Sequence, residues 1–354
     1  RGLGDVYKRQ VQGFKFKVFQ LMPTATLAPE RTAPAFYGRL LDHLVWVILA
    51  AVLVVCSLTI DNFFQVGIFV NIARQATFVG ILAAGLTLVI IAGHMDLSIE
   101  SVMAFSAMLA AYLVGSNGAG LGLAIPVWAT LVLSLALGAL VGLVNGWLVV
   151  RLKINAFIVT LATFIIVRGL ALVLAGGRSV FGLPEAFRGV ANASVAGIPV
   201  LVLILASVFL GLHFVLTRVR FGRYLYMIGG NATAPFRAGI PVNRILLQAF
   251  ILSGILAALA GWLLAARTNG ATANLGTGML FEAFAAVVIG GVSLTGGVGR
   301  LSGVIAGVLL LSTIDTAINV MGMPPHYMQV IRGGLVLLAV VFDSAKTSLR
   351  RLGE

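Results

Sequence analysis

Charged side chains within long apolar runs are the residues of this sequence whose types and spacing could do chemistry. They are Asp96, Glu100, Arg168, Glu282 and Asp315, with Asn145 and Asn319 as uncharged companions. A charge inside a membrane span costs at least about 2.5–3.5 kcal/mol on insertion scales, so such residues mark solute pathways, proton relays or buried ion pairs. We therefore interpret them as candidates for a polar pathway across a membrane.

Two pairs of these residues have helical spacing. Asp96 and Glu100 are four residues apart at the expected start of a helix, and Asp315 and Asn319 have the same spacing in a later run. Residues four apart lie on one helical face. For the first pair a local role is favoured, because Asp96 or Ser98 can cap the helix and the carboxylates complement its positive end.

Arg168 lies in the middle of an apolar run, far from either end. A buried guanidinium needs a carboxylate or several carbonyl groups as partners. An ion pair with Asp315 or Glu282 is the structural interpretation, and a polar lining for a hydroxylated solute is the functional one. The two are compatible. Glu282 opens its own run, where it is expected to cap a helix.

Motifs for enzymatic chemistry are absent from the sequence. It contains no Gly-x-x-x-x-Gly-Lys-Ser/Thr loop for nucleotide phosphates, no His-Glu-x-x-His metal motif and no Gly-x-Ser-x-Gly nucleophile turn. The single cysteine, Cys56, allows neither an internal disulfide nor a cysteine-based metal site. We expect a chain that is not an enzyme and that binds no metal and no cofactor.

The elements that must position these residues follow from the composition. Hydrophobic residues make up 60% of the 354 residues and charged residues 10%, whereas soluble domains have about 45–50% and about 25%. The mean hydropathy is +1.08. Long apolar runs carry this signal, so we predict an all-α polytopic membrane protein.

About ten transmembrane helices are expected, including short or broken segments. The apolar runs are Leu44–Ile60, Thr77–Ala92, Ile99–Val114, Ala124–Val150, Phe157–Ala175, Ile198–Leu216, Ile245–Ala266, Phe281–Leu294, Gly303–Met321 and Val330–Phe342. Several are shorter than the roughly 20 residues of a straight span. Short runs interrupted by glycine are typical of broken segments that line a cavity.

The basic residues predict the orientation. The net charge is +13, and ten crossings from a cytoplasmic N-terminus place most basic residues in cytoplasmic segments. External segments then hold only Arg74, Arg178, Arg188, Arg267 and Arg332. This is the positive-inside pattern, so both termini are expected in the cytoplasm and the partner of the positive charge is a lipid bilayer rather than nucleic acid.

Three parts of the chain are expected. Residues 1–43 form an N-terminal cytoplasmic tail, residues 44–342 the transmembrane domain, and residues 343–354 a C-terminal cytoplasmic tail. Residues 1–10 match nothing that follows and are expected to be foreign to the native protein. We expect no signal peptide, because about 40 polar or mixed residues precede the first apolar run.

Residues 217–244 form the longest cytoplasmic connection and carry five arginines. Within it, Asn231 is expected to cap a short helix over Ala232–Ala238, and Gly239 to end it, with Pro241 just beyond. Such a helix is a docking element for a partner protein. From composition alone, an ordinary positive-inside loop is the favoured interpretation.

Glycines within the runs predict close helix packing. Gly138 and Gly142, and likewise Gly303 and Gly307, are small residues four apart, which allow helices to approach closely. A faint internal echo aligns residues 93–98 with residues 290–295 and hints at a duplicated half.

Four stretches together resemble a known family. They are Gly85–Ser101 (GLTLVIIAGHMDLSIES), Asn145–Leu170 with Thr160 inside it, Gly222–Ile240 (GRYLYMIGGNATAPFRAGI) and Ala285–Gly299 (AAVVIGGVSLTGGVG). They resemble the permease subunits of ATP-binding cassette importers of the ribose/xylose/arabinose/galactose group, which are related to branched-chain amino acid permeases. The match covers nearly all of the chain from Leu44 onward. His94 and Glu100 replace glycines of the family motif, adding a titratable pair near the pathway.

The resemblance implies a function and partners. It implies a translocation subunit that imports a monosaccharide across the bacterial inner membrane with a second permease copy, cytoplasmic ATP-binding cassette subunits that use the ATP, and an external (periplasmic) solute-binding protein. It also turns the 217–244 loop into a coupling segment. The coupling residues are then Gly222, Arg223, Gly229, Gly230, Asn231 and Gly239. The pathway or buried polar residues are Asp96, Ser98, Glu100, Asn145, Thr160, Arg168, Glu282, Asp315 and Asn319.

Two alternatives stay open. The same machinery could carry another small polar solute, such as an amino acid. A secondary transporter driven by an ion gradient would instead use Asp96, Glu100 or Asp315 as proton carriers. Dependence of uptake on protons separates this second alternative from the importer.

Overall fold

The computed structural model describes residues 35–231 and 234–324, with scattered positions from 327 to 341. The helices are α2 (Ala35–Thr59), α3 (Val66–Ile91), α4 (Ile99–Val114), α5 (Val127–Arg151), α6 (Ala156–Leu174), α7 (Glu185–Asn192), α8 (Val200–Arg218), α9 (Arg220–Gly230), α10 (Ala234–Arg237), α11 (Val242–Thr268), α12 (Met279–Ile289) and α13 (Leu301–Val320). The predicted tails at 1–34 and 343–354 lie outside the described residues, as does most of the tenth apolar run. The helical fold class is confirmed.

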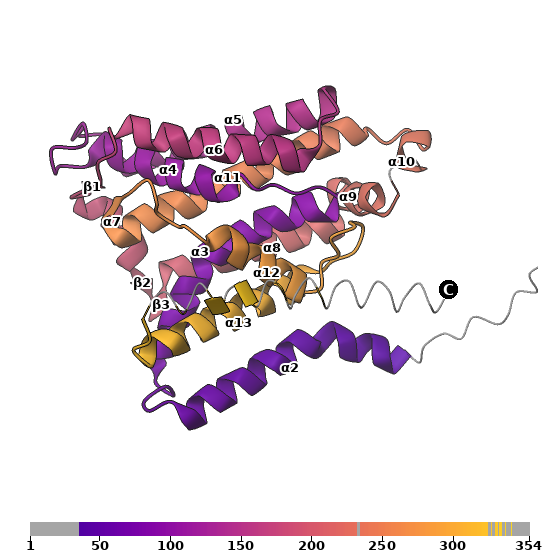
Figure 1. The fold of residues 1–354 in the computed structure, drawn as a ribbon, viewed down its shortest axis with the longest axis horizontal. Helices are drawn as coiled ribbons and strands as arrows, with labels where there is room; N and C mark the ends of the chain where they lie inside the picture. Colours follow the sequence, from indigo (N-terminus) through magenta and orange to yellow (C-terminus); the bar gives the residue numbers. More distant parts are fainter. Residues whose placement is uncertain are drawn as a thin grey trace, which may run out of the picture. The chain divides into compact units, whose positions relative to one another are not determined.

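Two short antiparallel strand pairs connect helix ends. β1 (Val180–Phe181) pairs with β4 (Gly270–Ala271), and β2 (Ser194–Val195) pairs with β3 (Ile198–Pro199). The first pair ties the connection after α6 to the end of α11. β1 and α7 lie at one end of the helices, and α9 and α10 lie at the opposite end (Figure 1).

Six helices in the described part of the chain are long and apolar enough to cross a membrane. They are α3, α5, α6, α8, α11 and α13. Three shorter apolar helices accompany them, namely residues 44–59 of α2, α4 and α12. With 16 and 11 residues, α4 and α12 fall short of the roughly 20 that a straight span needs. The prediction of short segments is therefore confirmed for these two.

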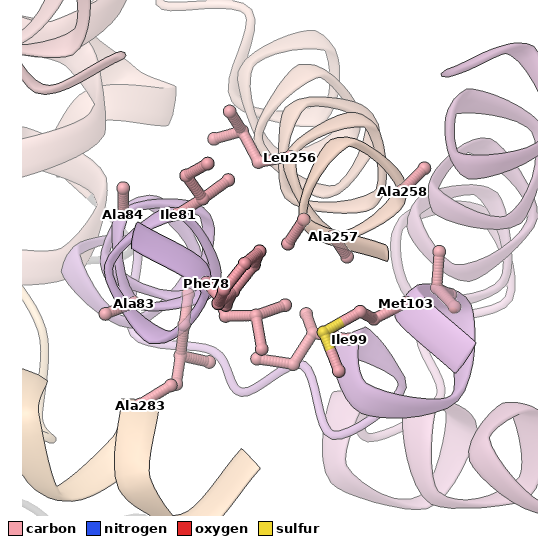
Figure 2. Close-up of a cluster of buried hydrophobic side chains, with 14 of the residues drawn as sticks. Phe78, Ile81, Ala83, Ala84, Ile99, Met103, Leu256, Ala257, Ala258 and Ala283 are labelled. Atoms are coloured by element: carbon pink, nitrogen blue, oxygen red, sulfur yellow. The ribbon is translucent and has the colours of Figure 1, made fainter. Parts of the chain in front are cut away.

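The two central helices, α3 and α11, are surrounded by other helices, so apolar residues lie around most of their circumference. α3 and α11 are buried along most of their length, whereas α5, α6 and α8 leave large apolar side chains exposed, as lipid-facing helices do. Figure 2 shows the contact between the central helices, where Phe78 and Ile81 of α3 lie near Leu256 and Ala257 of α11, with Met103 of α4 alongside.

The predicted glycine pairs lie at helix contacts. A Cβ atom on Gly138 would lie 2.6 Å from the Cβ of Ala258, and one on Gly142 would lie 2.8 Å from the Cα of Ile251, both on α11. On α13, a Cβ on Gly303 or Gly307 would overlap the carbonyl oxygen of Gly290 or Ala286 at α12. The close helix approach that the small residues predict is confirmed.

Gly142→Leu is expected to lower the free energy of unfolding by about 3 kcal/mol or more, since the side chain would push α5 away from α11. Thermal unfolding of the purified protein in detergent measures this change. Gly211→Leu on α8 is the matched control, because no atom lies within 4 Å of a Cβ at that position. Equal unfolding temperatures for the two variants would contradict the packing account.

Candidate functional site

Asp96 is the centre of a buried polar network in the connection between α3 and α4. Its Oδ1 accepts hydrogen bonds from the backbone N–H of Ser98 at 3.0 Å and from the Ser98 hydroxyl at 2.6 Å, and its Oδ2 accepts one from the Ser253 hydroxyl on α11 at 2.9 Å. Only 1% of Asp96 is exposed. The sequence offers Asp96 or Ser98 as the cap of α4. The Ser98 hydroxyl makes no capping bond and donates to Asp96, whose carboxylate also binds the backbone N–H of Ser98 directly before the helix.

The network extends to two further helices. The side-chain amide of Asn145 on α5 donates to the Ser98 hydroxyl oxygen at 2.9 Å, and the Thr163 hydroxyl on α6 donates to the Asn145 carbonyl oxygen at 2.6 Å. Thr160 lies one turn before Thr163, and its hydroxyl is 3.4 Å from the carbonyl oxygen of Met95. The structure thus brings together Asp96, Ser98, Asn145 and Thr160, four of the polar residues singled out in the sequence.

Glu100 and Arg168 form a second buried cluster. Arg168 Nη2 donates to Glu100 Oε1 at 2.7 Å, and Arg168 Nη1 donates to the carbonyl oxygen of Ala273. The predicted partners of Arg168, Asp315 and Glu282, are therefore wrong. Arg168 lies on α6, which packs against α4, and this places the guanidinium beside the first turn of α4.

The same carboxylate holds the start of α12. Glu100 Oε2 accepts hydrogen bonds from the backbone N–H of Gly278 at 2.9 Å and of Leu280 at 3.1 Å. These N–H groups lack partners within the helix, and a negative charge beside them is favourable. Glu282, the predicted cap, is buried in the first turn of α12, and the Gly278 and Leu280 N–H groups are bound by Glu100 from α4.

Two short helices therefore begin at one charged group. Glu100 lies in the first turn of α4 and binds the N-terminus of α12. Discontinuous helices whose N-termini meet at the middle of a bundle form substrate and ion sites in transporters. The arrangement supplies hydrogen-bonding groups and a balanced charge, and the described residues contain no cluster of His, Cys, Asp and Glu that could hold a metal ion.

The remaining predicted polar residues lie on α13. Asp315 is buried, and its Oδ2 accepts a hydrogen bond from the side-chain amide of Gln75 on α3 at 3.3 Å. Asn319 is exposed near the end of α13. Asn319 is therefore not buried beside Asp315, because it lies in the last turn of α13, and its assignment to a pathway stays a prediction.

Sequence reasoning missed Gln75, Thr163 and Ser253. Each is a polar residue in or beside an apolar run, as Asn145 is, so the same signal could have identified them. α3 begins at Val66, before the apolar run that the sequence predicts from Thr77. The polar residues in its first turns interrupt the apolar run without ending the helix.

The 217–244 connection contains two helices. α9 covers Arg220–Gly230, where the sequence predicted a loop, and it buries Leu225 and Ile228 while Arg223 is exposed. The predicted cap of the following helix is confirmed, because the Asn231 side-chain oxygen accepts a hydrogen bond from the backbone N–H of Ala234 at 3.3 Å.

Gly239 and Gly222 shape the ends of these helices. Gly239 follows α10 with a φ of +73°, a left-handed conformation that favours glycine at a helix end, as predicted. α10 itself is described only over Ala234–Arg237 of the expected 232–238. A Cβ on Gly222 would overlap the backbone of Leu216, so this glycine permits the sharp turn from α8 into α9.

A model of the family described as the branched-chain amino acid transport system / permease component matches residues 68–340. The chain belongs to this permease family. It is 35% identical to the L-arabinose ABC transporter permease protein AraH of Azospirillum brasilense over 332 residues, which cover 93% of this chain and 95% of that protein. No solved structure matches the chain significantly.

Two further relatives also match the chain over most of its length. The permease is 36% identical over 302 residues to the ribose import permease protein RbsC of Escherichia coli K12, covering 84% of this chain and 92% of that protein. It is 34% identical over 319 residues to the L-arabinose transport system permease protein AraH of the same strain, covering 89% and 94%. The family resemblance read from the sequence is confirmed. The chain is a multi-pass membrane permease and not an enzyme.

Proposed function

We propose that this chain is the membrane-spanning subunit of an ATP-binding cassette importer that carries a monosaccharide across the inner membrane of a bacterium. The observation that carries the proposal is its similarity, over nearly its whole length, to arabinose and ribose permeases. The hydroxyl and amide groups around Asp96 support it, because such groups can hydrogen-bond a sugar. ATP is bound and hydrolysed by separate subunits, and this chain binds no cofactor.

The charge distribution supports one orientation. Exposed basic side chains gather at the end of the helices that holds α9 and α10; they are Arg151, Lys153, Arg218, Arg220, Arg223, Arg237, Arg244 and Arg300. By the positive-inside rule this end faces the cytoplasm. Residues 44–342 would then form the transmembrane domain, with about ten crossings and both tails in the cytoplasm.

The pathway would run along the polar groups between the central helices. Asp96, Ser98, Asn145 and Thr160 join α5, α6 and α11 around the connection after α3. The Glu100–Arg168 ion pair lies where α4 and α12 begin. Glu282 and Asp315, both buried, would be further polar residues along the same path.

The partners follow from the function. The exposed α9–α10 surface would contact a cytoplasmic ATP-binding cassette subunit, and the end with β1 and α7 would face an external solute-binding protein. Two permease subunits, identical or different, would form the membrane unit. Isolation of the tagged permease from its native membrane in mild detergent tests this assembly. We expect a stoichiometric ATP-binding cassette chain to co-elute, and a permease that elutes alone would contradict the proposal.

Arg223→Glu is expected to lower recovery of the ATP-binding cassette subunit by roughly tenfold, since it reverses an exposed charge on the proposed docking surface. Quantitative co-purification measures the effect. Arg178→Glu is the matched control, because Arg178 is exposed at the opposite end of the permease. Equal recovery with the two variants would place the docking surface elsewhere.

A further inference from the structure

Three backbone segments meet at the end of α9 without side chains between them. The backbone N–H of Gly297, in the turn after α12, donates to the carbonyl oxygen of Ile91, at the end of α3, at 2.8 Å. A Cβ atom on Gly229 of α9 would overlap both the Ile91 oxygen and the Gly297 nitrogen. The Cα of Gly229 therefore lies directly over this hydrogen bond, and only a glycine fits there.

A second glycine closes the contact from the other side. A Cβ on Gly296 would lie 2.8 Å from the backbone N and Cα of Gly93 and 3.0 Å from the Cα of Gly229. Gly296 has a φ of +87°, which also favours glycine. We call the contact among Gly93, Gly229, Gly296 and Gly297 the glycine junction. Because it packs backbone on backbone, no side-chain rotation can absorb a displacement.

The two turns in the junction have the same helix-ending geometry. Gly93 N–H donates to the Ile90 carbonyl and His94 N–H to that of Val89, whereas Gly291 and Val292 make the equivalent bonds to Val288 and Val287 after α12; this pattern is a Schellman motif. Gly93 is thus equivalent to Gly291. The internal similarity seen in the sequence aligned Gly93 with Gly290, so that alignment is wrong by one residue.

Each turn leads directly to part of the candidate site. The turn after α3 continues into Asp96, whose carboxylate binds α11 through Ser253. The turn after α12 ends a helix whose other end is bound by Glu100. Tyr226 of α9 adds a further link, because its hydroxyl donates to the Gly299 carbonyl at 2.8 Å. Burial raises the pKa of the Tyr226 phenol above its ordinary value.

We propose that the glycine junction is the joint through which a displacement of α9 moves the turns after α3 and α12 as one body, and so reaches both the Asp96 network and α12. The inference rests on the proposed function, in which an ATP-binding subunit acts on α9. Gly229 and Gly296 are then positioning residues for transport, and they touch neither the solute nor the ATP-binding subunit.

Gly229→Ala in the complete importer, with its ATP-binding subunit and binding protein in proteoliposomes, tests the proposal. We expect the ATP-binding subunit to co-purify and hydrolyse ATP as in the parent complex. Solute uptake should fall by roughly tenfold or more, within the range of coupling between distant sites, and hydrolysis should no longer respond to the loaded binding protein. Gly211→Ala on α8, with no atom within 4 Å of the new Cβ, should leave all three measurements unchanged.

Two results with this variant would overturn the proposal. One is uptake at the parent rate, and the other is loss of the ATP-binding subunit, which would make the junction a docking determinant. Failure of the proposed function is distinguishable, because the parent permease itself would then recover no ATP-binding subunit.

If Gly229→Ala does not fold, hydrogen exchange measured on the parent complex tests the proposal without a variant. The Gly297 amide should exchange slowly both with and without a non-hydrolysable ATP analogue, because the junction moves as one body. Fast exchange in either state would show that the junction opens, which would overturn the proposal.

Discussion

Arg168→Met is expected to lower the free energy of unfolding of the permease by about 3 kcal/mol, because it leaves the Glu100 carboxylate buried without its cation. The estimate is at the low end for a broken buried pair, since Glu100 keeps the backbone N–H groups of Gly278 and Leu280 as donors. Unfolding in a denaturing-detergent titration, followed by the loss of helical circular dichroism, measures the change.

The double variant Glu100→Gln/Arg168→Met is the control for charge. Removing both charges should recover most of the lost stability, because a neutral amide still accepts a backbone hydrogen bond and no buried charge remains. The single variant Glu100→Gln completes the comparison. If the stability lost in the double variant equals the sum of the losses in Arg168→Met and Glu100→Gln, the two side chains do not interact. That result would contradict the ion pair and the arrangement of α4, α6 and α12 around it.

Asp96→Ala is expected to lower solute uptake by more than about tenfold, equivalent to about 1.4 kcal/mol in the transport barrier. The substitution removes the acceptor of the Ser98 and Ser253 hydroxyls and of the Ser98 backbone N–H. A buried donor without an acceptor costs about 1–3 kcal/mol, so the connection after α3 would lose its fixed position. Uptake of a labelled sugar into proteoliposomes measures the effect.

Asp96→Asn separates hydrogen bonding from charge. Its amide oxygen can still accept the two bonds from Ser98, whereas its NH2 group cannot accept the bond from Ser253. We therefore expect uptake between that of the parent and that of Asp96→Ala, with intact assembly. Uptake at the parent rate in Asp96→Ala would show that the network is not needed for transport.

Much of the helix framework could be predicted from apolar runs. The run Ile99–Val114 coincides with α4, because polar or flexible residues bound it on both sides. The start of α3 could not be predicted in this way, since Asn71, Arg74 and Gln75 interrupt the apolar run within the helix. α9 was missed because its glycines hide a helix whose Leu225 and Ile228 are buried by its neighbours.

In the candidate site, the sequence likewise predicts which residues need a partner, but it does not predict which residue the partner is. Apolar surroundings alone mark Asp96, Glu100 and Arg168 as residues that need partners. Which partners they find depends on which helices are neighbours, and the start of α12 reaches Glu100 across 178 residues of sequence. The glycine junction is a similar case, because a contact among backbones leaves no signal in the types of neighbouring side chains.

In the proposed function, ATP hydrolysis in a partner subunit drives transport through this permease. The most direct measurement uses proteoliposomes that contain the permease and its ATP-binding subunit, with the binding protein and a labelled pentose on the external side. We expect uptake that requires ATP on the cytoplasmic side and proceeds without an ion gradient. Uptake by the permease alone that follows a proton gradient and ignores ATP would contradict it.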